Sequence, residues 1–314
     1  MENKKYQLQF FGKGGELFSI FIVNFLLQIV TLGIYYPWAK AKTLQYLYGA
    51  TEFEGSRLQF HGTGNEMFRG FIKAIVVIAI IYFSYFFLVY QQQILIATLI
   101  LLLGIFSLLP LVIHGSYRYR MSRTSWRSIR FGYRGDRLEL AKLFWKGAFL
   151  TVITLGIYGA WFSMNLRNYV MSNVRFGNAQ FKYNGKGGDY FVMNLIGYLL
   201  TILTLGIYGF WWQKTLFDYY INNLSIENGE QQIQFKSKAT GAGFMGLIIV
   251  NLLIIIFSLG LATPWAIVRT MNYVFSNIEL EGNVDVEQLL QTEENYTDAT
   301  SEDLADFFDF DLVI

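Results

Sequence analysis

The side chains that most often carry out catalysis are few in this sequence and form no known pattern. The two histidines, His61 and His114, lie far apart and lack a matching carboxylate pattern, so we expect them at turns or interfaces and not in a metal or catalytic pair. The chain has no cysteine, which excludes thiolate nucleophiles, thiolate metal ligands and disulfides. It also has no nucleophile-elbow or zinc-protease motif. We therefore predict that the protein is not an enzyme and uses no cofactor or metal.

Two glycine-rich stretches could bind phosphate. Residues 12–15 and 185–188 both read GKGG and precede apolar runs, and backbone N–H groups at the start of a helix attract anions. Neither stretch has the spacing or the Ser/Thr of a P-loop. We predict a turn into a helix with an outward lysine, and phosphate or lipid-headgroup binding is the alternative.

Polar side chains inside apolar runs are costly in a membrane unless they are hydrogen-bonded. Four amides occur in such positions: Asn24, Gln28, Asn194 and Asn251. We expect them to bond between helices, or alternatively to line a wet cavity. The apolar runs hold no deep Asp or Glu, which argues against a carboxylate proton relay.

Basic residues occur in pairs spaced four apart at the entrances of apolar runs. Arg69 pairs with Lys73, and Lys142 pairs with Lys146, so each pair shares one helix face. Contacts with anionic lipid headgroups are the favoured interpretation, and a path for a substrate anion is the alternative.

The composition is that of an integral membrane protein. The chain of 314 residues is 54% hydrophobic and only 15% charged, and residues 75–113 contain no Asp, Glu, Lys or Arg. The net charge of +2 hides an asymmetry, because residues 279–314 carry twelve acidic and no basic residues. The basic body suits an anionic lipid surface. Its basic residues form no single stripe, so we expect no nucleic acid partner.

An octapeptide recurs along the chain. It reads TLGIYYPW at residues 31–38, TLGIYGAW at 154–161, TLGIYGFW at 204–211 and, more loosely, SLGLATPW at 258–265, each with a Tyr eight residues after the Trp. We predict a joint where an apolar helix meets the membrane interface, with Gly as the flexible element and Tyr and Trp as anchors. Packing between helices and an aromatic substrate cage are the alternatives. The predicted motif residues are Thr31, Gly33, Tyr35, Trp38, Thr154, Gly156, Tyr158, Trp161, Thr204, Gly206, Tyr208, Trp211, Gly260 and Trp265.

The octapeptide belongs to a longer repeating pattern of about fifty residues. Alternating segments turn at residues 55–56, 177–178 and 228–229, which predicts β-hairpins. A degenerate copy has LGIF at residues 103–106 and Leu109 in place of the Trp. We predict a membrane domain at residues 1–278, with units at about 7–59, 60–130, 131–182, 183–234 and 235–278. Residues 279–314 form an acidic tail that we expect to be disordered.

These motifs, the FxGxG-type openings, TLGIYxxW and the Tyr-bearing segment after the Trp, resemble the YjgN-like family (domain of unknown function 898) of bacterial multi-pass inner-membrane proteins. The resemblance covers nearly all of the chain up to the acidic tail. It implies an inner-membrane location and supplies no activity or catalytic residue.

The predicted fold is an integral membrane protein, mainly α-helical with short β-hairpins, with about six hydrophobic helices built from about five internal repeats. The hydropathy segments are 17–38, 68–90, 94–113, 138–161, 190–212 and 244–265. Strict alternation of six spans would place the basic segment 162–189 outside, against the positive-inside rule. The alternative is that each octapeptide turns the chain back, which places all basic segments on the cytoplasmic side.

Two functions remain open at this point. Transport of a small solute or lipid requires a polar cavity past Asn24, Asn194 and Asn251, whereas a scaffold or envelope-maintenance protein requires a packed bundle. The expected partners are a bilayer with anionic headgroups and, for the acidic tail, a protein that binds around Phe307, Phe308 and Phe310.

Overall fold

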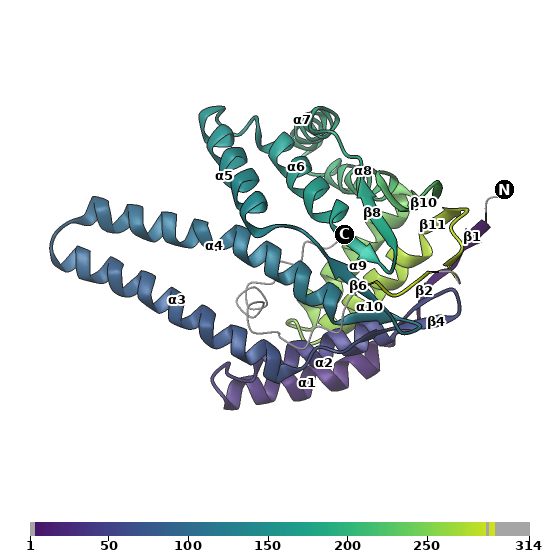
Figure 1. The fold of residues 1–314 in the computed structure, drawn as a ribbon, viewed down its shortest axis with the longest axis horizontal. Helices are drawn as coiled ribbons and strands as arrows, with labels where there is room; N and C mark the ends of the chain where they lie inside the picture. The colour runs from purple at the N-terminus through teal and green to yellow at the C-terminus, as the bar shows by residue number, and fades with distance from the viewer. Residues whose placement is uncertain (1–3, 287–288, 293–314) are drawn as a thin grey trace.

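The structure, a computed structural model, describes residues 4–286 and 289–292 (Figure 1). In this part of the chain the helices form pairs, and each pair is followed by strands. The helix pairs are α1 (Gly14–Val30) with α2 (Tyr36–Gly49), α3 (Gly64–Tyr90) with α4 (Ile94–Ser122), α5 (Arg137–Ile153) with α6 (Gly159–Ser172), α7 (Gly187–Leu203) with α8 (Gly209–Asn222), and α9 (Gly241–Phe257) with α10 (Thr263–Ser276). The strands are β1 (Lys4–Tyr6), β2 (Leu8–Phe10), β3 (Thr51–Phe53), β4 (Ser56–Phe60), β5 (Thr124–Trp126), β6 (Ile129–Tyr133), β7 (Val174–Phe176), β8 (Ala179–Tyr183), β9 (Leu224–Asn228), β10 (Gln231–Ser237) and β11 (Ile278–Gly282).

All strands belong to one sheet that nearly closes on itself. The order is β1-β11-β10-β9-β8-β7-β6-β5-β4-β3-β2, and every pairing is antiparallel. Gln7 alone separates β1 from β2, yet Tyr6 pairs with Leu280 on β11 and Leu8 pairs with Phe53 on β3. The first and last strands in the sheet order, β1 and β2, are therefore consecutive in the chain, and the sheet forms a nearly closed barrel.

The main hydrophobic core fills the inside of this sheet. Buried side chains from strands all around it form a single cluster, including Trp126 and Ile233, each 1% exposed. The Trp126 Nε1–H donates to the Phe53 carbonyl at 2.8 Å, which satisfies the one polar group of this ring. Because side chains occupy the interior, the sheet acts as a packed core.

The chain after β11 covers one end of this core. Val284 and Val286 are buried in the cluster, and the Tyr6 hydroxyl donates to the Val284 carbonyl at 2.6 Å. The predicted acidic tail begins at residue 279, but residues 279–282 belong to β11 and residues up to 286 pack on the core. Residues 293–314, with the aromatic segment proposed to bind a partner, lie outside the described residues.

All helix pairs leave the barrel-like sheet at the same end of its strands. Each strand pair is antiparallel and connects to helices at both of its termini, so the tight turns at residues 54–55, 127–128, 177–178 and 229–230 lie at the opposite end of the barrel. Neighbouring pairs contact one another through α2 with α3, α4 with α5, α6 with α7, α8 with α9, and α10 with α1. The helices thus form a closed ring on one side of the sheet, and α3 and α4 extend well beyond the other pairs (Figure 1).

The prediction of about six hydrophobic membrane helices is wrong. Among the described residues, two helices are long and apolar enough to cross a bilayer, α3 with 27 and α4 with 29 residues. The predicted segments 17–38, 138–161, 190–212 and 244–265 each contain a turn between two shorter helices. A helix of 17 residues, such as α1, α7 or α9, is about 25 Å long, which is less than the hydrocarbon core of about 30 Å. Hydropathy misses these turns because their own residues are apolar.

Candidate membrane-facing site

Each octapeptide is a turn that reverses the chain. In the first copy, Leu32 and Gly33 have φ angles of 51° and 88°, and such left-handed residues end a helix. The Gly33 N–H donates to the Gln28 carbonyl at 2.7 Å. The Thr31 hydroxyl accepts from the Tyr35 N–H at 3.0 Å, so it starts the returning helix. The same bonds recur in the copies at residues 154–161, 204–211 and 258–265. Of the two alternatives for the octapeptide, the structure has the turn.

The tip of each short helix pair presents a leucine outward. Leu32, Leu155, Leu205 and Leu259 are 93%, 94%, 95% and 92% exposed, and all four have positive φ. A leucine in this conformation costs about 1–2 kcal/mol, and glycine is the usual residue there. An exposed side chain adds nothing to the packing of the fold, so these leucines point to a surface that meets an apolar environment.

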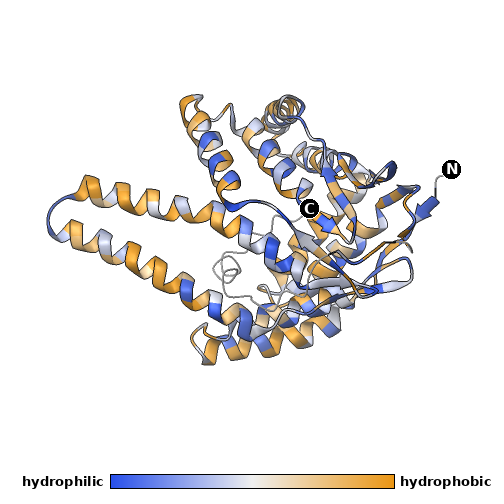
Figure 2. Cartoon of the chain, viewed as in Figure 1, coloured by the Kyte–Doolittle hydropathy of each residue, from blue (hydrophilic) through white to orange (hydrophobic). Residues whose placement is uncertain are grey.

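Further apolar side chains surround each tip leucine. Figure 2 shows hydrophobic residues at the free ends of the short pairs and hydrophilic residues nearer the sheet. The exposed tip residues include Val30, Ile34, Val152, Ile153, Ile157, Ile202, Leu203, Ile207, Phe257 and Leu261. Apolar surface on several separate tips that all project from one side of the protein is typical of membrane insertion.

The octapeptide tryptophans join neighbouring helix pairs. Each packs on the glycine that begins the first helix of the next pair, and a Cβ at that glycine would overlap the indole ring. The contacts are Trp38 on Gly64, Trp161 on Gly187, Trp211 on Gly241 and Trp265 on Gly14. Each ring is therefore partly buried by packing between helices, which is one of the alternatives to an interfacial belt. Trp211 and Trp265 remain 39% and 41% exposed. Helix α5 begins with Arg137 in place of glycine.

The tyrosines eight residues later hold the start of the first helix in the same pair. The Tyr46 hydroxyl accepts from the Lys13 N–H at 2.7 Å and donates to the Lys13 carbonyl at 3.0 Å. Tyr169 and Tyr219 bond in the same way, 33 residues from their partners. In both GKGG stretches the lysine N–H is thus already bonded, which favours the predicted turn over a phosphate cradle.

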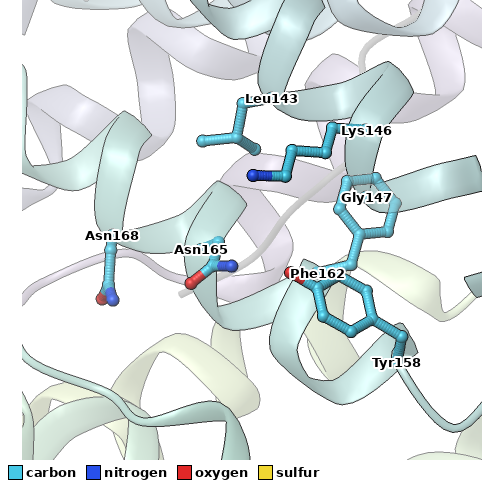
Figure 3. Close-up of a pocket in the computed structure, with 7 residues that line it drawn as sticks. All are labelled: Leu143, Lys146, Gly147, Tyr158, Phe162, Asn165 and Asn168. Atoms are coloured by element: carbon cyan, nitrogen blue, oxygen red, sulfur yellow. The ribbon is translucent and has the colours of Figure 1, made fainter. Parts of the chain in front are cut away.

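A cavity of about 390 Å³ lies between α5 and α6 (Figure 3). Helix α5 contributes Lys146 and Gly147, and a Cβ at Gly147 would overlap the Phe162 ring from α6. The Asn168 amide donates to the Gly185 carbonyl at 3.0 Å, while its Oδ1 is buried without a hydrogen-bond partner. The lining residues are Leu143, Lys146, Gly147, Tyr158, Phe162, Asn165 and Asn168. The cavity therefore combines a cation, an unused acceptor and apolar walls.

Comparison with known proteins decides the family. A model of the DUF898 family, described as bacterial protein of unknown function, matches residues 5–184, 179–230 and 212–307. The chain belongs to the DUF898 family. The resemblance to YjgN-like proteins is thereby confirmed.

The curated relatives of this DUF898 chain are inner membrane proteins. Inner membrane protein YjgN of Escherichia coli strain K12 is 31% identical over 157 residues, which cover 50% of this chain and 37% of the relative. Inner membrane protein YjgN of Salmonella typhimurium strain LT2 is 32% identical over 133 residues, 42% of this chain and 32% of the relative. The chain thus spans about a third of the length of these relatives. They support the predicted inner-membrane location, and no solved structure matches the chain.

The structure does not bring the predicted amides of this DUF898 protein together. The Asn24 amide donates to the Ala39 carbonyl at 3.2 Å, and that of Asn251 to the Thr270 hydroxyl at 2.8 Å, each within its own helix pair. Asn194 bonds to a carbonyl of its own helix at 2.7 Å, and the Gln28 carbonyl accepts from the octapeptide turn. These bonds fit the prediction of hydrogen bonds between helices for Asn24 and Asn251.

The position that holds an asparagine in α1 and α9 holds a glycine in α5 and α7, the corresponding helices of the other two short pairs. Fourteen residues before the octapeptide Trp, the sequence has Asn24 and Asn251 but Gly147 and Gly197. The residue after the Trp is alanine in the asparagine pairs, whereas it is Phe162 or Trp212 in the glycine pairs. These two rings pack on the glycines. Each pair therefore fills the same place either with a hydrogen bond or with an aromatic ring.

The basic pairs lie on separate helices, Arg69 and Lys73 near the start of α3 and Lys142 and Lys146 on α5. Beside the first pair, the Arg123 side chain binds both oxygens of Glu66 at 3.2 Å, which fixes the base of the α3–α4 pair. Of the predicted basic residues, Lys146 lines the cavity.

The sequence patterns did not predict Asn165 and Asn168 as site residues, although both line the cavity between α5 and α6. Alignment on the Trp could have revealed Asn168, since Gln45 has the same place in α2 and likewise donates to a loop glycine carbonyl, that of Gly62 at 2.9 Å.

The two histidines lie in different parts of the structure. His61 bonds to Ser125 at 2.7 Å, and burial lowers its pKa. His114 lies against the Tyr133 ring. Among residues 4–286 and 289–292, no three His, Asp or Glu side chains gather as a metal site.

Proposed function

We propose that this DUF898 protein is a membrane scaffold whose four short helix pairs insert into one leaflet, while α3 and α4 cross the bilayer. The observation that carries the proposal is the set of tip leucines, which are more than 90% exposed in a backbone conformation that disfavours leucine. Burial in hydrocarbon would stabilise each inserted leucine by about 1.5–3 kcal/mol, which exceeds the cost of about 1–2 kcal/mol of its conformation.

The distribution of charged residues on α3 and α4 determines the orientation in the membrane that we propose. The turn between α3 and α4, residues 91–93, consists of uncharged glutamines, whereas the sheet end of these helices carries Arg69, Arg118, Arg120 and Arg123. By the positive-inside rule, the glutamine turn faces the periplasm and the sheet faces the cytoplasm. The basic residues at this end then meet the anionic headgroups of the cytoplasmic leaflet.

A scaffold is favoured over transport by the amides. A transport path was expected to pass Asn24, Asn194 and Asn251, but all three bond inside their own helices or pairs. The sheet interior is filled by buried side chains. We also propose that the chain repeats one unit of two helices and two strands, supported by the tyrosine bonds that recur at a separation of 33 residues.

Single-cysteine labelling tests the proposal, and the chain has no native cysteine to remove. The variants are Leu155→Cys at a tip, Gln92→Cys at the glutamine turn and Glu230→Cys in the turn between β9 and β10, at the end of the sheet opposite the helices. With a membrane-impermeant maleimide, we expect Gln92→Cys to react from the periplasmic side of spheroplasts and Glu230→Cys to react only in inverted vesicles. Leu155→Cys should react only after detergent is added.

Two results would contradict the scaffold. Labelling of Leu155→Cys in intact spheroplasts would mean that α5 spans the bilayer. Labelling of Leu155→Cys as fast as Glu230→Cys in inverted vesicles would mean that the tips lie in water.

A further inference from the structure

We propose that the cavity between α5 and α6 binds the headgroup of an anionic phospholipid that also carries a hydrogen-bond donor, such as phosphatidylglycerol. The inference rests on the proposed insertion of the helix pairs and assigns one lipid class to one place on them. Lys146 is exposed at the cavity and forms no ion pair with another described residue.

The depth of the cavity matches that of lipid phosphates. Lys146 lies about 10 Å from the tip end of α5 at Ile153, and Asn168 about 13 Å from the tip end of α6 at Gly159, at 1.5 Å per residue. Half of a hydrocarbon core is about 15 Å thick. A pair whose tip reaches the middle of the bilayer therefore places both residues near the headgroups.

The other short pairs change from apolar to polar at the same level. Four residues after each octapeptide Trp, the exposed residues are Lys42, Asn165, Thr215 and Arg269. Toward the tip, the exposed side chains are mainly aliphatic or aromatic, with Ser163 and Gln213 as polar exceptions. The cavity thus lies at a polar band that all four pairs share.

The cavity offers two complementary groups to one headgroup. The Lys146 ammonium can bind a phosphate oxygen through a charge-assisted hydrogen bond. The Asn168 Oδ1 is buried and has no hydrogen-bond partner, while the Nδ2 of the same amide donates to the Gly185 carbonyl, and a buried acceptor without a donor is costly. A headgroup hydroxyl would supply that donor. Leu143 and Phe162 would flank the glycerol backbone and the first acyl carbons.

The α5 helix provides a matched control for the charge. Lys142 lies one turn before Lys146 on the same helix and does not line the cavity. Purified full-length protein in a neutral detergent is titrated with dihexanoyl phosphatidylglycerol, and binding is measured by native mass spectrometry. Loss of a charge-assisted hydrogen bond weakens binding by about tenfold or more, so we expect this loss for Lys146→Gln. Lys142→Gln should stay within about twofold of the wild type, and Lys146→Arg should retain most of the binding because it keeps the charge.

Ligand comparisons on the wild-type protein test the headgroup. Phosphatidylcholine has the same phosphate but no donor for Asn168, and we expect it to bind about tenfold more weakly than phosphatidylglycerol. Inorganic phosphate lacks acyl chains and should not compete at millimolar concentration. Equal losses for Lys142→Gln and Lys146→Gln, equal binding of the two lipids, or effective competition by inorganic phosphate would each overturn the site.

The labelling readout separates this inference from the proposed function. Lys146→Gln combined with Leu155→Cys should leave the tip cysteine protected, because the tip inserts through its own apolar surface. Protection without lipid selectivity would overturn the headgroup site alone. Loss of protection in the wild-type background would overturn the insertion on which the site depends.

Discussion

The Trp265 ring on α10 packs on Gly14 at the start of α1, so residues 251 positions apart close the ring of helices. The same two ends of the chain meet in the sheet, where Tyr6 pairs with Leu280. The fold is thus closed twice by its termini, once between helices and once between strands.

Gly14→Ala should weaken this closure, because the added Cβ would overlap the Trp265 ring. We expect a loss of about 1–3 kcal/mol in the free energy of unfolding, typical of overpacking. Gly15→Ala is the control, since nothing lies within 4 Å of a Cβ at that position, and it should be neutral or stabilising by up to about 1 kcal/mol. Tryptophan fluorescence during thermal unfolding in detergent measures both, and equal midpoints for the two variants would argue against the closure.

The Gly147 and Phe162 contact should be exchangeable for an asparagine and alanine pair. Gly147→Asn alone collides with the Phe162 ring, and Phe162→Ala alone leaves a cavity that costs about 3–5 kcal/mol. The double variant recreates the arrangement in which Asn24 bonds to the Ala39 carbonyl at 3.2 Å. It should be more stable than the sum of the single losses by at least about 1 kcal/mol. Chemical denaturation of all four proteins gives this coupling energy, and strict additivity would refute the exchange.

The sheet closure should loosen in acid through Glu279. Its carboxylate bonds to Lys238 at 2.8 Å and to Lys5 at 2.7 Å, and these two lysines lower the pKa of Glu279 from 4.5 to about 2. A carboxyl with a lowered folded-state pKa stabilises the fold fully above its unfolded pKa, and this contribution is lost as the pH falls through the folded pKa. We expect the protection of the β1 and β11 amides, which is the factor by which their exchange is slower than that of an unstructured peptide at the same pH, to decrease as the pH falls from about 4.5 to 2. Glu279→Gln should remove this dependence, and identical pH profiles for variant and wild type would rule it out.

The local elements were largely predictable from the sequence. The hairpin turns predicted at residues 55–56, 177–178 and 228–229 lie within one residue of the turns at 54–55, 177–178 and 229–230, and Gly55, Gly177 and Gly229 all have positive φ. Glycine is the residue that tolerates this conformation, so the signal is local and strong. The octapeptide turn has a weaker signal, because membrane helices tolerate Gly and Pro and because its first left-handed residue is a leucine, where the usual stop signal is glycine.

The sheet closure and the cavity could not be predicted because they depend on distant residues. Pairing of Tyr6 with Leu280 has no signature in either strand alone. The cavity beside Lys146 exists because Gly147 admits the Phe162 ring and so brings α6 to a particular distance from α5. The spacing of four residues predicts that Lys142 and Lys146 share one helix face, but it gives no means to distinguish them.

The missing glycine at the start of α5 divides the ring unequally. Four of the five contacts between neighbouring pairs contain a Trp on a Gly, whereas α5 begins with Arg137 and α4 carries Leu109 where the degenerate copy would have its Trp. In Figure 1, α4 and α5 diverge toward their free ends. The ring therefore has a seam between α4 and α5, where the helices should separate first under load and where, in the insertion we propose, bilayer lipid can reach between two helix pairs.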